Sequence, residues 1–508
     1  KPFTVRGRAR GAWGLMGAPR QGGARPRVDP GRTSRPGTSA ITGRIHMTKL
    51  FSMHIPKPFL AFAAIEALVL VLSLYLGVVT SWVDFDFARS DVLEFLPQAL
   101  AYAAIIMTIM FSLGIYNETI ATTLANVVIR LAVSFAISFV VLSAIFYMFP
   151  EFMIWRSVMA GAMVSAFIGV LTAHTVFLRV IDLTPLKRRV AIIGTGGQAA
   201  RIESLERGGQ SFGFIGVGYF AAPGEEAEVP SGRIVPASTS LVDYVTRRNV
   251  DEIVIAVQDR RQRLPMEELV DCGFRGVDIT DYLSFWEREA KRVDLDVLPR
   301  NWMLFSNSFP GGRLHQFLKR LFDLTVSLIA LTLLLPLMIA TAIAIRLDSP
   351  GPVFYRQRRV GLRGATFELL KFRSMRPDAE GDGVPRWATN QDDRTTTIGA
   401  FIRKVRIDEI PQILNVLKGE MSFVGPRPER PYFVEQLAAQ IPFYRERFRV
   451  KPGITGWAQL NFPYGASVSD ARKKLEYDLY YIKHFGLMLD TIIVLQTIRV
   501  VLWPPKSA

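Results

Sequence analysis

Long apolar stretches alternate with polar segments in the first third of the chain. Four of them run over residues 58–80, 95–115, 124–149 and 157–180. Each is about long enough to cross a hydrocarbon core of roughly 30 Å, because a helix rises about 1.5 Å per residue. The connections between them are short. The pattern therefore predicts a four-helix transmembrane domain over residues 47–184.

The hydropathy pattern changes near Arg189, where short apolar runs replace the long ones. Predicted strands cover Val190–Ile193, Phe214–Phe220 and Glu252–Val257, and Gly276–Ile279 continues the series. Strands that alternate with helical segments indicate parallel β–α units. Residues 185–298 are accordingly predicted to form a Rossmann-like α/β domain.

The first of these strands leads into the turn Gly194–Ala199, which has the spacing GxGxxA. In a strand–turn–helix context, such a turn lets the backbone approach a dinucleotide pyrophosphate. The strand over 214–220 has no Asp or Glu at its tip, however, so the acidic ribose ligand of a dinucleotide site is missing. No Tyr-x-x-x-Lys occurs in the chain. We therefore predict a degenerate Rossmann-like module without redox chemistry.

A fifth apolar segment, Leu321–Ile345, is long enough to span a membrane but carries Pro336 inside it. Proline removes a helical hydrogen bond and clashes with the preceding turn. Basic residues flank both ends, and positive charge favours the cytoplasmic side. The pattern predicts a re-entrant helix over residues 319–346 that turns back at Pro336. A straight, kinked crossing is the alternative.

The rest of the chain, residues 315–508 after a linker at 299–314, is predicted to be a mostly α-helical domain that includes this membrane helix. Two strands, Pro352–Tyr355 and Ala365–Phe372, flank a glycine-containing turn. One amphipathic helix is expected beyond residue 399, because its apolar positions recur every three or four residues. These positions are Ile402, Val405, Ile410, Ile413, Leu414 and Leu417.

Charge and composition place the protein at a membrane surface. Of the formal net charge of +16, residues 1–46 contribute +9 through nine arginines and Lys1 against Asp29. This Arg-, Gly- and Pro-rich segment is predicted to be a disordered extension. Met47 is a possible natural start, and a nucleic-acid-binding tail is the alternative. The remaining +7 suits lipid headgroups and nucleotide substrates better than a nucleic-acid duplex. Cys272 is the only cysteine, which excludes intrachain disulfides and thiolate zinc sites.

The basic residues also predict an orientation. Lys49 and Lys57 precede the first span, and Lys187, Arg188 and Arg189 follow the fourth. Both ends of the four-helix domain are therefore expected on the cytoplasmic side of the membrane.

Candidate chemistry is concentrated in residues 399–428. Asp408 and Glu409 are adjacent carboxylates, which repel each other unless a cation or a shared proton relieves them. Arg403, Lys404 and Arg406 precede them, and arginine binds phosphate oxygens bidentately. Arg427 lies in the stiff turn Gly425–Pro428. A solvated charged helix face is the alternative for such a segment taken alone.

Several motifs in this half together resemble one family. KRLFDL, GPVFYRQRRVG, KFRSM, RxxRIDEIPQILNVLKGEMSFVGPRP and KPGITGWAQLN occur in order over nearly 190 residues. They resemble the bacterial sugar transferases, which are monotopic polyprenyl-phosphate phosphoglycosyl transferases. The front half resembles the longer members, which initiate exopolysaccharide or O-antigen assembly. The resemblance implies transfer of a sugar 1-phosphate from a UDP-sugar to polyprenyl (undecaprenyl) phosphate, with release of UMP.

The resemblance also implies roles for individual residues. Asp408 would be the nucleophile of a covalent phospho-aspartyl intermediate, and Glu409, with Asp408, would support a Mg²⁺ site. The candidates that bind the phosphates of the nucleotide sugar are Arg403, Arg427, Lys371 and Lys451. Pro336 matches the proline of the family's re-entrant helix, although the preceding residue, often serine, is Leu335 here. The implied partners are the membrane, the two substrates and a second copy of the chain, without nucleic acid.

Two other functions remain open on the sequence. A nucleotide-sensing scaffold would bind through Gly194–Ala199, but would not need Asp408, Glu409, Arg403 and Arg427 all intact. An oxidoreductase that acts on nucleotide sugars is disfavoured by the missing acidic ligand. Glucose or galactose is the expected sugar by resemblance, with N-acetylated and diamino sugars as alternatives.

Overall fold

The computed structural model describes most of the chain after residue 47. The described residues are 48–50, 53–55, 57–80, 95–116, 124–150, 153–180, 187–208, 213–258, 264–299, 312–376, 394–462, 465 and 467–502. The predicted extension over residues 1–46 lies outside them, as does most of the predicted linker over residues 299–314.

The first lobe is a bundle of apolar helices. It consists of α1 (Lys57–Thr80), α3 (Leu96–Ser112), α4 (Leu124–Met148) and α5 (Arg156–Val180), preceded by the short strands β1 (Thr48–Leu50) and β2 (Met53–Ile55). By length and composition, α1, α4 and α5 are able to cross a membrane. Helix α3 has 17 residues, about 26 Å, and is shorter than the predicted second span.

The second lobe is built on a parallel sheet of β3 (Arg188–Ile193), β4 (Phe214–Phe220), β5 (Ile234–Val235), β6 (Glu252–Ile255) and β7 (Asp278–Asp281). Its strand order is β5-β4-β3-β6-β7. Because the first strand lies in the middle and the order reverses there, this is the Rossmann order. The predicted Rossmann-like domain is therefore present.

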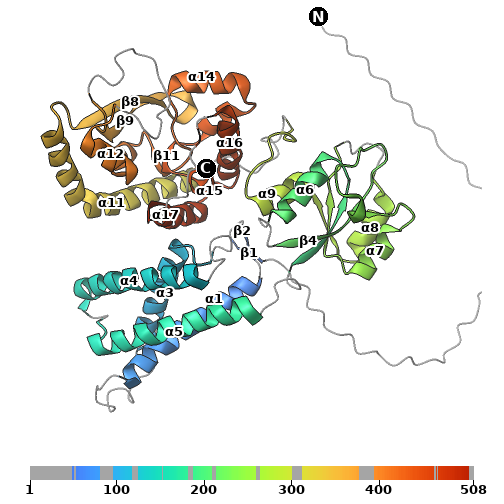
Figure 1. The fold of residues 1–508 in the computed structure, drawn as a ribbon, viewed down its shortest axis with the longest axis horizontal. Helices are drawn as coiled ribbons and strands as arrows, with labels where there is room; N and C mark the ends of the chain where they lie inside the picture. The colour runs from blue at the N-terminus through green and yellow to red at the C-terminus, as the bar shows by residue number, and fades with distance from the viewer. Residues whose placement is uncertain are drawn as a thin grey trace, which may run out of the picture. The chain divides into compact units, whose positions relative to one another are not determined.

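Helices cover both faces of this sheet (Figure 1). The helices are α6 (Gly197–Arg207), α7 (Leu241–Arg248), α8 (Met266–Phe274) and α9 (Tyr282–Ala290), with the turn η3 at Ser231–Arg233. Val190 and Ile192 pack with α6 and α9, whereas Ala191 and Ile193 pack with α7 and α8. Successive strand residues point to opposite faces, so a fully apolar strand fills two cores at once.

The glycine turn before α6 holds an acidic side chain of the same chain. The Thr195 amide donates to Glu225 Oε2 at 3.1 Å, and Glu228 donates its own amide to the Thr195 carbonyl. Glu225 therefore occupies one backbone donor of the kind that binds phosphate in a dinucleotide turn. The strand tip lacks an acid, as the sequence indicated, but an acid five residues further on lies inside the turn.

The third lobe begins with the long helix α11 (Arg313–Asp348) and a hairpin of β8 (Phe354–Val360) and β9 (Thr366–Phe372) joined by η4 (Leu362–Gly364). It continues through α12 (Thr397–Lys404), η5 (Ile407–Glu409), α13 (Gln412–Lys418), β10 (Ser422–Val424), α14 (Pro431–Gln440), η6 (Tyr444–Arg449), β11 (Gly453–Thr455), α15 (Trp457–Asn461), α16 (Val468–Lys483) and α17 (Leu487–Leu502).

Helix α11 contains Pro336 and is drawn as two arms set at an angle (Figure 1). The proline has no amide to donate to the Thr332 carbonyl, and its ring crowds that carbonyl, which is a sufficient cause for a bend. The second arm packs against β9 and α12, where Met338 and Ile345 meet Phe372 and Ile402. Whether α11 re-enters the membrane face that it leaves stays a prediction.

Residues just after α9 belong to the core of the third lobe. Val293, Leu295 and Leu298 are buried in the same cluster as residues of α14 and α16. The Trp457 indole donates to the Lys291 carbonyl at 2.9 Å. The segment that the sequence assigned to the end of the α/β domain therefore completes the hydrophobic core of the domain that carries Asp408.

Candidate active site

The segment that carries the two carboxylates is not one amphipathic helix, so that prediction is wrong. Helix α12 ends at Lys404, Arg406 adopts a left-handed conformation with φ of 61°, and Asp408 and Glu409 lie in the short 3-10 turn η5 before α13. Pro411 favours a break in this region. In a continuous helix it could not donate to the Ile407 carbonyl and its ring would collide with it. Val405, expected on the buried stripe, is 40% exposed.

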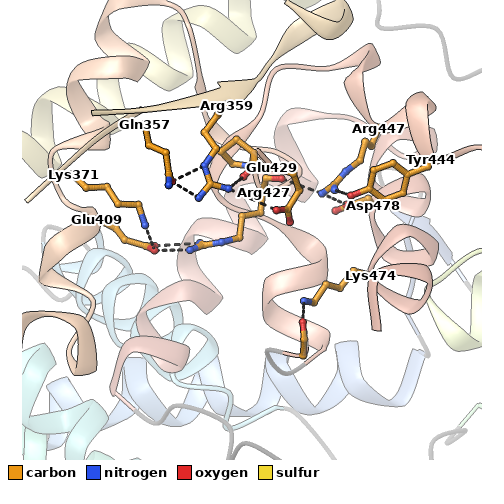
Figure 2. Close-up of polar contacts among 12 residues, drawn as sticks. Gln357, Arg359, Lys371, Glu409, Arg427, Glu429, Tyr444, Arg447, Lys474 and Asp478 are labelled. Carbon is orange, nitrogen blue, oxygen red and sulfur yellow. Dashed lines mark hydrogen bonds and ion pairs between the residues drawn. The ribbon is translucent and has the colours of Figure 1, made fainter. Parts of the chain in front are cut away.

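Two cations from other parts of the domain contact this turn, and Figure 2 shows Glu409 between Lys371 and Arg427. Arg427 binds Glu409 through both of its terminal nitrogens, with Nη1–Oε2 at 3.2 Å and Nη2–Oε1 at 2.5 Å. Lys371 on β9 donates to Glu409 Oε1 at 3.0 Å and lies 3.9 Å from Asp408 Oδ2. The structure thus brings together four of the residues predicted for the site.

The two neighbouring carboxylates have opposite pKa shifts. Burial, with the charge of Glu409, raises the pKa of Asp408 above its usual value, and Lys371 opposes that rise. Burial also disfavours the charged form of Glu409, but Arg427 and Lys371 outweigh it and hold the pKa of Glu409 well below its usual range. Glu409 is thus a fixed anion. Asp408 is the carboxylate that titrates, and it accepts no hydrogen bond from any described residue.

The turn that carries Arg427 is held by close backbone contact and by a buried ion pair. A Cβ at Gly425 would lie 2.3 Å from the Lys451 carbonyl oxygen, so only glycine fits where β10 and β11 run side by side. Arg447 donates to the Arg427 carbonyl at 3.0 Å, to Tyr444 Oη at 2.7 Å and to Asp478 Oδ2 at 2.8 Å. Arg447 and Asp478 therefore fix the backbone from which Arg427 reaches Glu409.

We expect Asp478→Asn to destabilise this domain by about 3–5 kcal/mol, because it leaves the buried Arg447 guanidinium without its counter-charge. Thermal unfolding in detergent measures the effect as a lower Tm. Glu435→Gln, an exposed carboxylate on α14, is the control and should leave the Tm unchanged. An equally small shift for both variants would contradict the supporting role of the Arg447–Asp478 pair.

Further charged residues extend the site beyond those that the sequence singled out (Figure 2). Arg359 donates to Gln357 and to the Pro428 carbonyl and lies 3.7 Å from Glu429. Lys474 on α16 donates to the Gly465 carbonyl at 2.7 Å, and burial lowers its pKa. Sequence reasoning missed both. The arginines near Arg359 are equally typical of a strand whose charged side chains face solvent. The residues around Lys474 have no pattern that distinguishes it from an ordinary charged helix position.

Two of the predicted phosphate-binding residues form no ion pair with the carboxylates in the described part of the chain. Arg403 forms no ion pair with Asp408 or Glu409 among the residues described, and its Nη1 atom is buried without a hydrogen-bond partner there. Lys451 has Arg320 and Asp323 as its nearest charged neighbours. The structure therefore supports Arg427 and Lys371 as parts of one cluster with the carboxylates, and places Lys451 elsewhere.

The donor set fits Mg²⁺ only in part. No group of three or more His, Cys, Asp or Glu side chains comes together in the described part of the chain. Both oxygens of Glu409 are engaged by Arg427, whereas the carboxylate of Asp408 is available. Mg²⁺ is commonly held by one or two carboxylates together with substrate phosphates. Asp408 and Glu409 suit such a shared site rather than a cage made of protein ligands alone.

Chemically, the cluster combines an available carboxylate with fixed positive charge. Lys371 and Arg427 are the kinds of group that neutralise phosphate oxygens, and Asp408 is the group able to attack a phosphorus atom.

Comparisons with known proteins match two parts of the chain to families. A family model described as bacterial sugar transferase matches residues 314–504, and one described as a CoA-binding domain matches residues 112–264. The chain is 44% identical over 234 residues to a UDP-N-acetylgalactosamine-undecaprenyl-phosphate N-acetylgalactosaminephosphotransferase of Aeromonas hydrophila, a match that covers 46% of this chain and 54% of the relative.

Two further relatives are UDP-glucose:undecaprenyl-phosphate glucose-1-phosphate transferases. That of Xanthomonas campestris pv. campestris is 35% identical, with 62% of this chain and 66% of the relative covered. That of Caulobacter vibrioides is 40% identical, with 47% of this chain and 96% of the relative covered. The chain thus spans less than two thirds of the first two relatives and nearly all of the third.

Proposed function

This chain belongs to the bacterial sugar transferase family, and from that membership and the cluster around Asp408 we propose that it transfers a sugar 1-phosphate from a UDP-sugar to a polyprenyl phosphate. The observation that carries the proposal is an available, buried carboxylate beside Lys371, with Glu409 and Arg427 fixed next to it. In biological terms this would be the initiating step of exopolysaccharide or related glycan assembly.

The reaction proceeds in two displacements. A carboxylate oxygen of Asp408 attacks the sugar-bearing phosphorus of the UDP-sugar, the bond from that phosphorus to the UMP oxygen breaks, and UMP leaves. The sugar phosphate is then joined to Asp408 as an acyl phosphate. An oxygen of polyprenyl phosphate attacks the same phosphorus, the aspartyl oxygen–phosphorus bond breaks, and the carboxylate is regenerated.

Lys371 and Arg427 supply positive charge where the diphosphate must approach an anionic nucleophile. Asp408 and Glu409, with the donor's phosphate oxygens, would hold Mg²⁺, which supplies further charge neutralisation when bound. Arg427 binds both oxygens of Glu409 and offsets its negative charge, which weakens the repulsion between Glu409 and the phosphates of the donor. Arg406, 3.7 Å from Glu409, adds to the same field.

Release of UMP from a panel of UDP-sugars, with undecaprenyl phosphate in detergent or nanodiscs, tests this function. The relatives are named for glucose and for N-acetylgalactosamine, so both donors belong in the panel with UDP-galactose. The expected result is repeated turnover with at least one donor, in which UMP release beyond one per active site depends on the lipid acceptor. Absence of release from every donor, by folded protein, would contradict the proposal.

Polyprenyl phosphate is confined to the membrane and the UDP-sugar to water, so an active site that binds both must lie at the membrane surface. We place this domain on the cytoplasmic face of the inner membrane, with α11 as a re-entrant helix. The bend in α11 and the basic residues at both of its ends support this placement.

A topology measurement checks the re-entrant placement. Cysteines introduced at exposed Arg313 and Leu347 should both be labelled from the cytoplasmic side, after Cys272, a buried free thiol, is replaced. Pro336→Ala should favour a straight crossing, because it restores the missing amide. Labelling of position 347 from the periplasm in the otherwise unchanged helix would contradict re-entry.

A further inference from the structure

Two cations meet at the end of α13 opposite to the carboxylates. Arg320 on α11 donates to the carbonyls of Val416 and Leu417 at 2.6 and 2.7 Å and so caps that helix. A Cβ added to Gly419, the residue that ends α13 with φ of 87°, would lie 3.6 Å from Arg320 Nη2 and 3.8 Å from Lys451 Nζ. The guanidinium and the ammonium therefore border the same small space, which glycine leaves open.

Neither cation is paired with an acidic side chain in the part of the chain that the structure describes. Lys451 forms no hydrogen bond or ion pair there, and its pKa is lowered by burial and then by the charge of Arg320. The nearest carboxylate, Asp323, is already engaged, since its Oδ1 accepts from Lys319, from the Ser422 hydroxyl and from the Phe423 amide. The space beside Gly419 thus has an excess of positive charge that an anion would relieve.

The helix that carries Arg320 also has an apolar surface. On α11, three side chains within two turns of Arg320 are exposed, namely Leu314 (70%), Phe317 (63%) and Leu321 (51%). Their spacing of three and four residues puts them on one face of the helix. In the proposed membrane placement this face meets lipid. A ligand that satisfies both the cations and this face carries an anionic group on an apolar chain.

We propose that Arg320 and Lys451 form a second anion site, which binds the phosphate of the polyprenyl phosphate acceptor before transfer. The inference rests on the proposed function. Two cations suit the phosphate monoester of polyprenyl phosphate, because it carries more negative charge than the phosphodiester of a phospholipid. Helix α13 has seven residues, about 10 Å, so a phosphate held here lies outside reaction distance of Asp408. The site thus recruits the acceptor to the membrane surface beside the carboxylates.

Binding of lipid to the full-length protein tests the site without any UDP-sugar. The protein is placed in phosphatidylcholine nanodiscs that contain either polyprenyl phosphate or phosphatidylglycerol, and the lipid retained by the protein is measured by native mass spectrometry. Lys451→Gln should lower retention of polyprenyl phosphate about tenfold, the loss expected for one charge-assisted contact, and Lys451→Arg should restore it. Lys473→Gln, which removes the same charge from an exposed position on α16, is the control and should retain lipid like the wild type.

Kinetics give a second, separate readout. Lys451→Gln should raise the KM for polyprenyl phosphate about tenfold while the KM for the UDP-sugar changes far less. Equal retention of polyprenyl phosphate by Lys451→Gln and the wild type would overturn the site even if the enzyme transfers sugar phosphate. Displacement of polyprenyl phosphate by phosphatidylglycerol would overturn the assignment of the acceptor. An inactive protein that still loses lipid with Lys451→Gln would contradict the transferase proposal, not this site.

Discussion

Asp408→Asn should lower UMP formation by about 10⁴-fold or more, the scale seen when a nucleophile is removed from an otherwise intact site. Asparagine preserves the shape of the side chain but cannot form an acyl phosphate. Since Asp408 accepts no hydrogen bond from any described residue, the substitution should leave the fold intact. The loss must appear even without lipid acceptor, because Asp408 acts in the first displacement.

Rapid quench of the wild type with UDP-sugar labelled in the sugar phosphate, in the absence of acceptor, measures this step directly. One UMP per active site should be released, and the label should be bound to the peptide that contains Asp408. Asp271→Asn makes the same chemical change at an exposed aspartate of α8 and should keep wild-type activity. Active wild type whose label never becomes attached to protein would show that transfer is direct and that Asp408 has another role.

The sequence predicted the strands and helices that follow from the spacing of apolar residues along a short segment. The strand Phe214–Phe220 is found with the predicted bounds, because its aromatic and β-branched residues favour a strand and the turn residues Pro223 and Gly224 follow soon after. The Rossmann order and three of the four membrane-length helices of the bundle also agree with prediction. The local sequence already singled out Asp408, Glu409 and Arg427, and the resemblance to a family gave them roles; no local pattern placed Lys371 beside them.

The rest depends on contacts between residues far apart in the chain. Arg447 lies in a run of charges that is typical of a solvated turn, yet it is buried on Asp478, 31 residues away. Glu225 fills the glycine turn only because the loop after β4 folds back over it. The broken helix at Arg406 was the one error with a local signal, since Pro411 disfavours a continuous helix. The sequence prediction missed it because apolar residues recur every three or four positions on both sides of the break, as they would in one continuous helix.

Lys371→Met should lower the rate of UMP release at neutral pH by about 10²–10³-fold, the cost of removing one electrostatic contact from a preorganised site. Lys371 is the cation that lies against both carboxylates, 3.0 Å from Glu409 and 3.9 Å from Asp408. Without it, two adjacent carboxylates would share Arg427 and the exposed Arg406. The donor's diphosphate would also meet less positive charge.

The pH dependence separates this electrostatic role from a merely structural one. Asp408 reacts as the anion, so activity is lost as the pH falls through its pKa, which is already raised by burial and by Glu409. Lys371 lowers that pKa, and its removal must raise it further. The acid limb of the pH–rate profile should therefore move to higher pH in Lys371→Met and return in Lys371→Arg. Arg356→Gln, which removes an exposed cation from β8, should leave the profile unchanged. An acid limb of Lys371→Met that stays in place or moves to lower pH would show that Lys371 does not set the ionisation of Asp408.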